Sequence, residues 1–136
     1  ALARVGLAGY DALWPRELSD GQQQRVASAR ALVTRPKLLL MDEPFSALDF
    51  QTRLSVSSDI SRIIRREGKT ALLVTHDISE AISLSDRIVV LSHRPATVKA
   101  IHDLGALRTV PPLERPSRPA FQTLFNQIWE ELDVNV

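Results

Sequence analysis

The sequence of 136 residues contains no cysteine, which excludes disulfide bonds, thiolate zinc sites and cysteine nucleophiles. No apolar run approaches the ~20 residues that span a bilayer, and the first residues lack the charged start of a signal peptide, so we expect a soluble protein. A large excess of one charge is also absent, because 17 Lys and Arg residues balance 16 Asp and Glu residues. This balance argues against nucleic acid or acidic lipid as a partner.

The composition, with 44% apolar, 24% charged and 5% aromatic residues, is typical of a globular protein of one domain at most. A chain of this length can bury roughly two-thirds of the surface that its unfolded state exposes. The sequence begins at Ala1 without methionine, in a segment that has the character of a helix end. We therefore expect a fragment of a longer protein.

Helical and strand patterns alternate along the chain. Short apolar runs such as KLLLMD and TALLVT are typical of strands buried on both faces of a parallel sheet, and apolar residues three and four apart predict helices between them. This order predicts an α/β fold with right-handed parallel crossovers. We expect helices near 20–33, 50–67, 78–82 and 121–132, strands at 37–42, 70–75 and 87–92, and an edge strand at 97–101 before an irregular Pro-rich stretch.

The run LLLMDEP carries two carboxylates at the end of a strand, where open α/β folds bind ligands. Asp42 can hold Mg²⁺ through water, because this ion keeps much of its hydration shell. Glu43 lies one residue further on, points differently, and can polarise a water for attack on a phosphoryl group. The alternative is that Asp-Glu-Pro is only a solvated junction between a strand and a turn.

Two further segments carry polar groups that suit a phosphate. The second strand ends in VTHD, which places His76 at the same edge of the sheet, where an imidazole can contact a terminal phosphate. In ELSDGQQQR, Ser19 and Gln22 have the spacing of a capping box. The unpaired N–H groups of the helix that starts there, next to Gly21 with no side chain, also suit an anion. The alternative for His76 is a purely structural role. For Ser19 and Gln22, a structural role as a capping box is compatible with an anion site at the same helix end.

In this order and spacing, the motifs resemble those of the ATP-binding subunit of ABC transporters. LSDGQ is similar to the signature LSGGQ, LLLMDEP to the Walker B motif, SALD (Ser46–Asp49) to the D-loop and VTHD to the switch-histidine loop. The resemblance implies the C-terminal half of a P-loop NTPase parallel sheet with flanking helices, plus part of the helical signature subdomain. It divides the chain into 1–110, the C-terminal part of the ATPase domain, and 111–136, a Pro-rich connection and a C-terminal helix.

The resemblance also implies roles for individual residues. Asp42 is similar to the Mg²⁺ residue, Glu43 to the general base and His76 to the sensor of the γ-phosphate. The signature residues that contact ATP on the partner subunit of a head-to-tail dimer, and the D-loop residue that couples the two sites, are Ser19, Gly21, Gln22 and Asp49. A helix from Ala1 to Leu13 is expected in the subdomain that faces the permease.

The implied function is ATP hydrolysis, with ATP and Mg²⁺ as cofactors, in a peripheral subunit at the cytoplasmic face of the membrane that powers solute import. The implied partners are a second ATP-binding subunit, permease subunits and, indirectly, a solute-binding protein. EAISLSDRIVVLSHRPATV and IWEELDV resemble importers of nitrate, sulfonate or taurine-type solutes. Two alternatives stay open: a soluble ABC ATPase acting on DNA or the ribosome, against which the near-neutral charge argues, and a non-catalytic fragment or interaction module.

The sequence departs from the family pattern in two places. It contains no G-x-x-x-x-G-K-[ST] phosphate-binding loop and no glutamine loop before the signature, so we expect the chain alone to be inactive, with half a nucleotide site. Asp20 stands where the family usually has glycine, which brings a carboxylate towards the polyphosphate. Without the missing half, we expect the strands KLLLMD and TALLVT to be incompletely covered.

The remaining candidate residues have simpler structural interpretations. His93 and His102 have no acidic or histidine partner at metal-ligand spacing. We expect Trp129 to lie in the core, and Arg115 and Arg118 to lie in a solvated Pro-rich connection.

Overall fold

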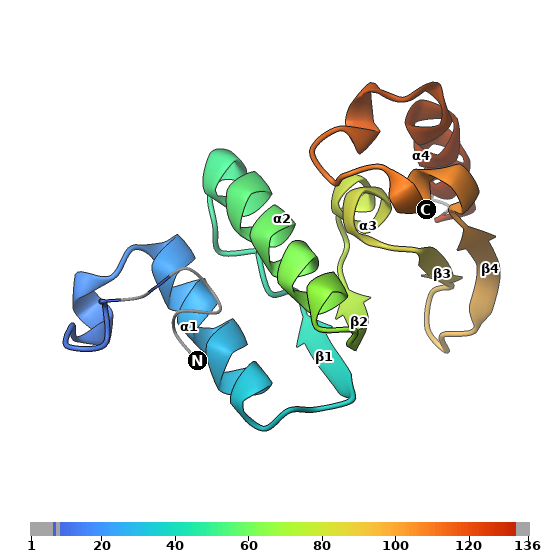
Figure 1. Ribbon diagram of the computed structural model, residues 1–136. Helices are drawn as coiled ribbons and strands as arrows, with labels where there is room; N and C mark the ends of the chain where they lie inside the picture. The colour runs from blue at the N-terminus through green and yellow to red at the C-terminus, as the bar shows by residue number, and fades with distance from the viewer. Residues whose placement is uncertain (1–6, 8, 133–136) are drawn as a thin grey trace. The chain divides into compact units, whose positions relative to one another are not determined.

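The computed structural model describes Leu7 and residues 9–132, apart from the side chains of Ser28, Leu32 and Val33. Helices and strands alternate along the chain (Figure 1), so the predicted α/β class is confirmed. The chain divides into two compact units, Ala1–Val74 and Thr75–Val136. The assignment of 1–110 and 111–136 to two functional parts stays a prediction. Within the described residues, no helix is both long and apolar enough to cross a membrane.

The first unit has the predicted strand–helix–strand order. A short 3₁₀ helix at Pro15–Glu17 precedes α1 (Asp20–Val33), and β1 (Leu38–Asp42) is joined by α2 (Phe50–Arg66) to β2 (Thr70–Val74). The two strands are parallel, with Leu38 opposite Thr70 and Asp42 opposite Val74, as the predicted crossover requires.

The helix predicted from Ala1 to Leu13 is only partly within the described residues. Ala1–Gly6 and Ala8 lie outside them, and residues 9–13 form turns and a bend, so the helix prediction is wrong for that part. Gly9 has a φ of 87°, a left-handed conformation that ends or interrupts a helix. Turn hydrogen bonds from Tyr10 N–H to the carbonyl of Leu7 (3.1 Å) and from Leu13 N–H to that of Tyr10 (3.2 Å) replace helical ones.

The helix α2 is amphipathic, and its apolar stripe is buried as the periodicity predicts. Its buried apolar residues are Val56, Ile60, Ile63 and Ile64. Gly68 ends the helix as expected, because its φ of 65° allows its N–H to reach the carbonyl of Arg65 (3.1 Å) while the next N–H reaches that of Ile64 (3.0 Å). The helix α1 packs against α2 (Figure 1).

The strands β1 and β2 are covered on one face only. Leu39 in β1 is 8% exposed, whereas Leu40, which points to the opposite face, is 70% exposed, and its neighbour Leu72 in β2 is 55% exposed. The prediction that both faces are buried is therefore wrong, and the prediction that these strands are incompletely covered is confirmed. The helices of the first unit supply apolar side chains to only one side of the pair.

The second unit combines a hairpin with helices. The helix α3 (Ile78–Leu84) leads into β3 (Arg87–Leu91) and β4 (Val98–Asp103), and α4 (Pro119–Glu131) follows two 3₁₀ helices at Gly105–Thr109 and Arg115–Ser117. The partner of β3 among the described residues is β4, and the pair is antiparallel, so the expected edge strand is confirmed and no parallel partner of β3 is described. The core of this unit is built around Ile78, Ile82, Ile88, Val90, Leu104, Leu107, Phe121 and Ile128.

Arg115 is buried, with 1% of its surface exposed, which corrects the prediction of a solvated arginine. Its Nη1 donates to the carbonyls of Ile82 (2.9 Å) and Ser85 (2.7 Å), and its Nε donates to that of Val110 (2.8 Å). The last carbonyls of α3 have no helical N–H donor, and the guanidinium supplies one. Arg118, three residues later, is exposed as predicted.

Trp129 is 52% exposed, so the prediction that it lies in the core is wrong. It stacks on Phe125, with ring centroids 6.4 Å apart, because residues four apart on α4 share a side of the helix. His102 has an acidic partner that sequence spacing did not indicate, since its Nε2 lies 2.6 Å from Oε2 of Glu131 at the end of α4. This pair joins β4 to α4 and supports the structural interpretation of His102. His93 is exposed.

Candidate functional site

The N-terminus of α1 has the predicted capping box. The N–H of Gln22 donates to Oγ of Ser19 (3.2 Å), and the N–H of Ser19 donates to Oε1 of Gln22 (3.0 Å). The carbonyl of Ser19 accepts from the N–H of Gln23 (2.8 Å). The N–H groups of Asp20 and Gly21 have no acceptor among the described residues, so this helix end keeps donors suited to an anion.

Gly21 lies against α2. A Cβ atom built on it would lie 3.0 Å from Cγ2 of Thr52 and 3.0 Å from Cγ2 of Val56. Sequence reasoning explained this glycine by the approach of a phosphate, whereas the structure adds a packing reason. Asp20, the neighbouring departure from the family pattern, is exposed, and its side chain makes no hydrogen bond or ion pair with a described residue.

The two carboxylates of the LLLMDEP run lie at the carboxyl end of β1, and both residues are exposed. The N–H of Glu43 donates to the carbonyl of Val74 (2.7 Å), which extends the contact between the two parallel strands. Glu43 has a φ of 44°, a left-handed conformation that costs a non-glycine residue about 1–2 kcal/mol. Its carbonyl accepts from Oγ of Ser46 (3.1 Å), so a turn holds this backbone in place.

The carboxylate oxygens at this end of β1 are of the type that Mg²⁺ takes as ligands. The described residues contain no cluster of three or more His, Cys, Asp or Glu side chains that could hold a metal ion. Mg²⁺ takes most of its oxygen ligands from water and phosphate and often needs only one or two carboxylates. Asp42, exposed at the strand end, can provide one.

The loop between β1 and α2 is anchored by two apolar side chains, since Phe45 is 1% and Leu48 is 6% exposed. Asp49 then caps α2: its Oδ1 accepts from the N–H of Thr52 (3.0 Å) and its Oδ2 from the hydroxyl of Thr52 (2.7 Å). The hydrogen bond from the backbone N–H of Thr52 and, after it, the bond from the Thr52 hydroxyl hold the pKa of Asp49 below its usual value. The cap therefore stabilises the fold at neutral pH, and its contribution is lost as the pH falls through that lowered pKa.

His76 belongs to the second unit and is exposed. It lies between two residues that fix the local backbone: the N–H of Asp77 donates to Oγ1 of Thr75 (3.1 Å), and Oδ1 of Asp77 accepts from the N–H of Glu80 (3.0 Å) and caps α3. His76 therefore belongs to the second unit, close to its start at Thr75. The other candidate residues all belong to the first unit: Ser19, Gly21, Gln22, Asp42, Glu43 and Asp49.

Thr52 is the residue of this region that sequence reasoning did not identify. It holds Asp49 through two hydrogen bonds and lies next to Gly21. The spacing of an aspartate and a threonine three residues later is the signal that indicates the cap. No local signal indicates the contact with Gly21, because the two residues belong to different helices.

A cavity of about 230 Å³ lies between α1, α2 and β1 in the first unit. Its lining is apolar apart from Gln24, Asp42 and the backbone, and includes Leu39, Met41 and Ile60. Such a lining lacks the convergent N–H donors and positive charges that phosphates require. The polar strand and helix ends, rather than this cavity, are the candidate functional site.

Sequence comparisons relate the chain to ABC proteins. Residues 1–46 match the ABC transporter family. The chain is 47% identical over 133 residues to the uncharacterized ABC transporter ATP-binding protein YtlC of Bacillus subtilis (strain 168), covering 97% of this chain and 51% of that protein. It is 55% identical over 110 residues to the aliphatic sulfonates import ATP-binding protein SsuB 2 of Rhodococcus jostii (strain RHA1), covering 81% and 45%. The chain thus spans about half the length of the curated relatives it matches.

The fold is similar to that of a solved ABC protein. The dimeric post-hydrolysis structure of the ATP-binding cassette MJ0796, bound to ADP and Pi, has a TM-score of 0.57 and 37% sequence identity to this chain. The match covers 75% of this chain and 43% of that one. The resemblance predicted from the motifs is therefore confirmed in both sequence and fold.

Proposed function

This chain belongs to the ABC transporter ATP-binding proteins, and we propose that it supplies such a protein with the groups that hydrolyse ATP. The observation that carries the proposal is the exposed carboxylate pair, Asp42 and Glu43, at the carboxyl end of a parallel strand pair. That edge of a parallel sheet is where α/β folds bind their ligands. The SALD turn and the capped start of α1 belong to the same unit.

The residues divide the chemistry between them. Asp42 holds Mg²⁺, which when bound neutralises charge on the transferring phosphoryl group. Glu43 accepts the proton of the attacking water, and a turn holds the backbone from which its carboxylate extends. His76 donates a hydrogen bond to the γ-phosphate.

The start of α1 acts on a nucleotide held by a partner subunit. The N–H groups of Asp20 and Gly21, with the hydroxyl of Ser19 and the amide of Gln22, bind the γ-phosphate in a head-to-tail dimer, and Asp49 couples the two sites. A dimeric arrangement is supported by the solved relative, whose structure is dimeric and holds ADP and Pi. The phosphate-binding loop comes from a segment outside these residues.

The whole protein is a peripheral subunit at the cytoplasmic face of the membrane, bound to permease subunits and supplied indirectly by a solute-binding protein. Sulfonate-type solutes are the proposed cargo class, because SsuB 2 of Rhodococcus jostii is named as an aliphatic sulfonates import protein. Magnesium-dependent ATP hydrolysis by the complete protein tests the proposal. Salt-dependent binding to DNA or ribosomal RNA, without stimulation by a permease, would favour a soluble ABC ATPase instead.

We expect the 136-residue chain alone to bind ATP no more tightly than about millimolar, a level of only ~4 kcal/mol. The reason is that the loop and lysine that hold the triphosphate are not in its sequence. Titration calorimetry with ATP and Mg²⁺ measures the affinity. A micromolar dissociation constant would show that these residues form a self-sufficient site.

Replacing Asp20 by glycine in the complete protein should raise ATP-dependent dimerisation and hydrolysis. A carboxylate ~6 Å from a phosphate charge repels that charge by nearly 3 kcal/mol at an effective dielectric of about 20. Removing the carboxylate also removes its favourable interaction with the dipole of α1. The variant should therefore melt slightly earlier while hydrolysing ATP faster, measured by gel filtration, ATPase assay and calorimetry. Because Asp20 is exposed, an unchanged rate would mean that its side chain stays turned to solvent when the dimer closes.

A further inference from the structure

The N-terminal ends of α1 and α2 are in close contact. A Cβ atom on Gly21 would lie only 3.0 Å from the methyl groups of Thr52 and Val56, a distance that packed side chains avoid. Gly21 is itself buried. A glycine at this position therefore lets the start of the signature helix rest directly on the first turns of α2.

Thr52 contacts both motifs at once. Its N–H and hydroxyl hold the two carboxylate oxygens of Asp49, at 3.0 Å and 2.7 Å, while its methyl group faces the Cα of Gly21. A β-branched side chain has few rotamers in a helix, and the hydrogen bond from its hydroxyl to Oδ2 of Asp49 restricts this one further. The methyl position is therefore set by the Asp49 cap.

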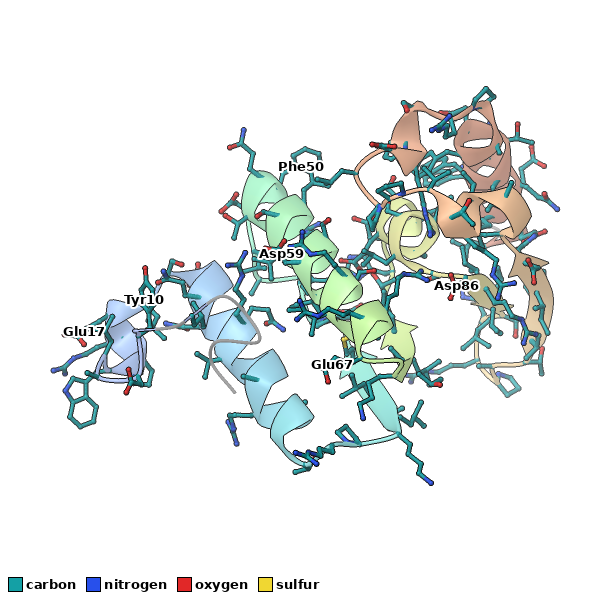
Figure 2. All side chains as sticks on the ribbon, viewed as in Figure 1. Tyr10, Glu17, Phe50, Asp59, Glu67 and Asp86 are labelled. Carbon is teal, nitrogen blue, oxygen red and sulfur yellow. The ribbon has the colours of Figure 1, made fainter. Side chains whose placement is uncertain are left out.

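A second contact fixes how α1 lies along α2. Arg25, one turn after Gly21, forms an ion pair with Asp59 on α2, and the two side chains are 23% and 30% exposed. Figure 2 shows Asp59 on the side of α2 that faces α1. Asp59 also pairs with Arg62 on its own helix at 2.5 Å. This partly buried pair limits sliding of one helix on the other, because sliding would separate the charges.

We propose that Thr52 is a positioning residue that couples the SALD turn to the signature segment Ser19–Gln22, so that a displacement of either motif moves the other. The proposal rests on the proposed function, in which both motifs act on nucleotide at the interface with a partner subunit. The physical basis is the close packing of Gly21 against the methyl group of Thr52. Packed interiors transmit strain because they have few voids. Thr52 acts through Asp49 and Gly21 and touches no reacting atom.

The test uses amide hydrogen exchange of the 136-residue chain, measured residue by residue by NMR without nucleotide. Gly21→Ala should raise the exchange rates of the N–H groups of Thr52 and Arg53, which lie in the other helix, about threefold to tenfold, the range expected when one hydrogen bond is weakened. Adding Thr52→Ser, which removes the methyl group and keeps the hydroxyl, should return them towards the original rates. The matched control, Thr123→Ser on α4, should not.

A further variant, Thr52→Val, keeps the test decisive if Gly21→Ala does not fold. Thr52→Val keeps the branched shape and loses the hydroxyl, so the Asp49 cap weakens; we expect faster exchange at Gln22 and Gln23 in α1 as well as in the first turn of α2. Changes confined to the helix that carries the substitution, or no reversal by Thr52→Ser, would overturn the coupling.

In the complete protein, the same reversal should be seen in kcat for ATP hydrolysis, with little change in the KM for ATP. If Thr52 had only a structural role, adding Thr52→Ser to the Gly21→Ala protein would not restore kcat when the two proteins are equally stable. If the complete protein hydrolyses no ATP, the proposed function fails, while the exchange result still decides whether the two motifs are coupled.

Discussion

Glu43→Gln in the complete ATP-binding protein should lower ATP turnover by about 10²- to 10⁴-fold, the range that general-base catalysis supplies. Glutamine keeps the size and hydrogen bonding of the side chain but cannot accept the proton of the attacking water. Binding of ATP should persist, because the phosphates and Mg²⁺ are held by other groups. The dimer should then accumulate in its ATP-bound form, which gel filtration and a single-turnover assay measure.

Glu130→Gln is the matched control, because Glu130 is exposed on α4 in the second unit. It should hydrolyse ATP at the original rate. Hydrolysis by the Glu43 variant at the same rate as the control would reassign the base, with His76 as the next candidate.

Arg115→Met should destabilise the second unit by roughly 3–5 kcal/mol, a large share of the stability of a small unit. Methionine fills much of the space of the arginine stem but donates no hydrogen bond. The carbonyls of Ile82, Ser85 and Val110 would lose the donors that they have at 2.7–2.9 Å. Each buried acceptor left without a partner costs about 1–3 kcal/mol.

Denaturant unfolding followed by Trp129 fluorescence, in a Trp14→Phe background, measures the effect in the second unit. Arg118→Met is the matched control, because Arg118 has a similar place in the Pro-rich stretch and a side chain that is 54% exposed. The control should shift the unfolding free energy by less than about 0.5 kcal/mol. Equal shifts for the two variants would show that the hydrogen bonds of Arg115 contribute no net stability.

Local patterns predicted the elements of the fold well. The apolar spacing of α2, its glycine cap and the two short apolar strands are all encoded within a few neighbouring residues. The partner of β3, the burial of Arg115 and the exposure of Leu40 depend on other segments, so periodicity alone could not show them. Arg115, for example, donates to a carbonyl 33 residues away, and a Pro-rich surrounding gave it the local character of a surface loop.

The candidate site was predictable where its geometry is local. The capping box of Ser19 and Gln22 and the exposed carboxylates after β1 follow from spacing within one segment. The contact of Gly21 with α2 could not be predicted in this way, because it joins segments about thirty residues apart through a methyl group whose position depends on the Asp49 cap. The left-handed backbone of Glu43 also has no sequence signal, since glutamate rarely adopts it.

Hydrolysis by covalently linked tandem dimers of the complete protein tests most directly the claim that Glu43 works together with the signature of the partner subunit. Ser19→Arg obstructs the signature, and Glu43→Gln removes the base. With the two substitutions in different subunits, both defects fall in the same composite site and the other site stays intact, so ATP hydrolysis should persist. With both in one subunit, each composite site carries one defect, and hydrolysis should be lost; activity in that arrangement, and its loss in the first, would contradict the account.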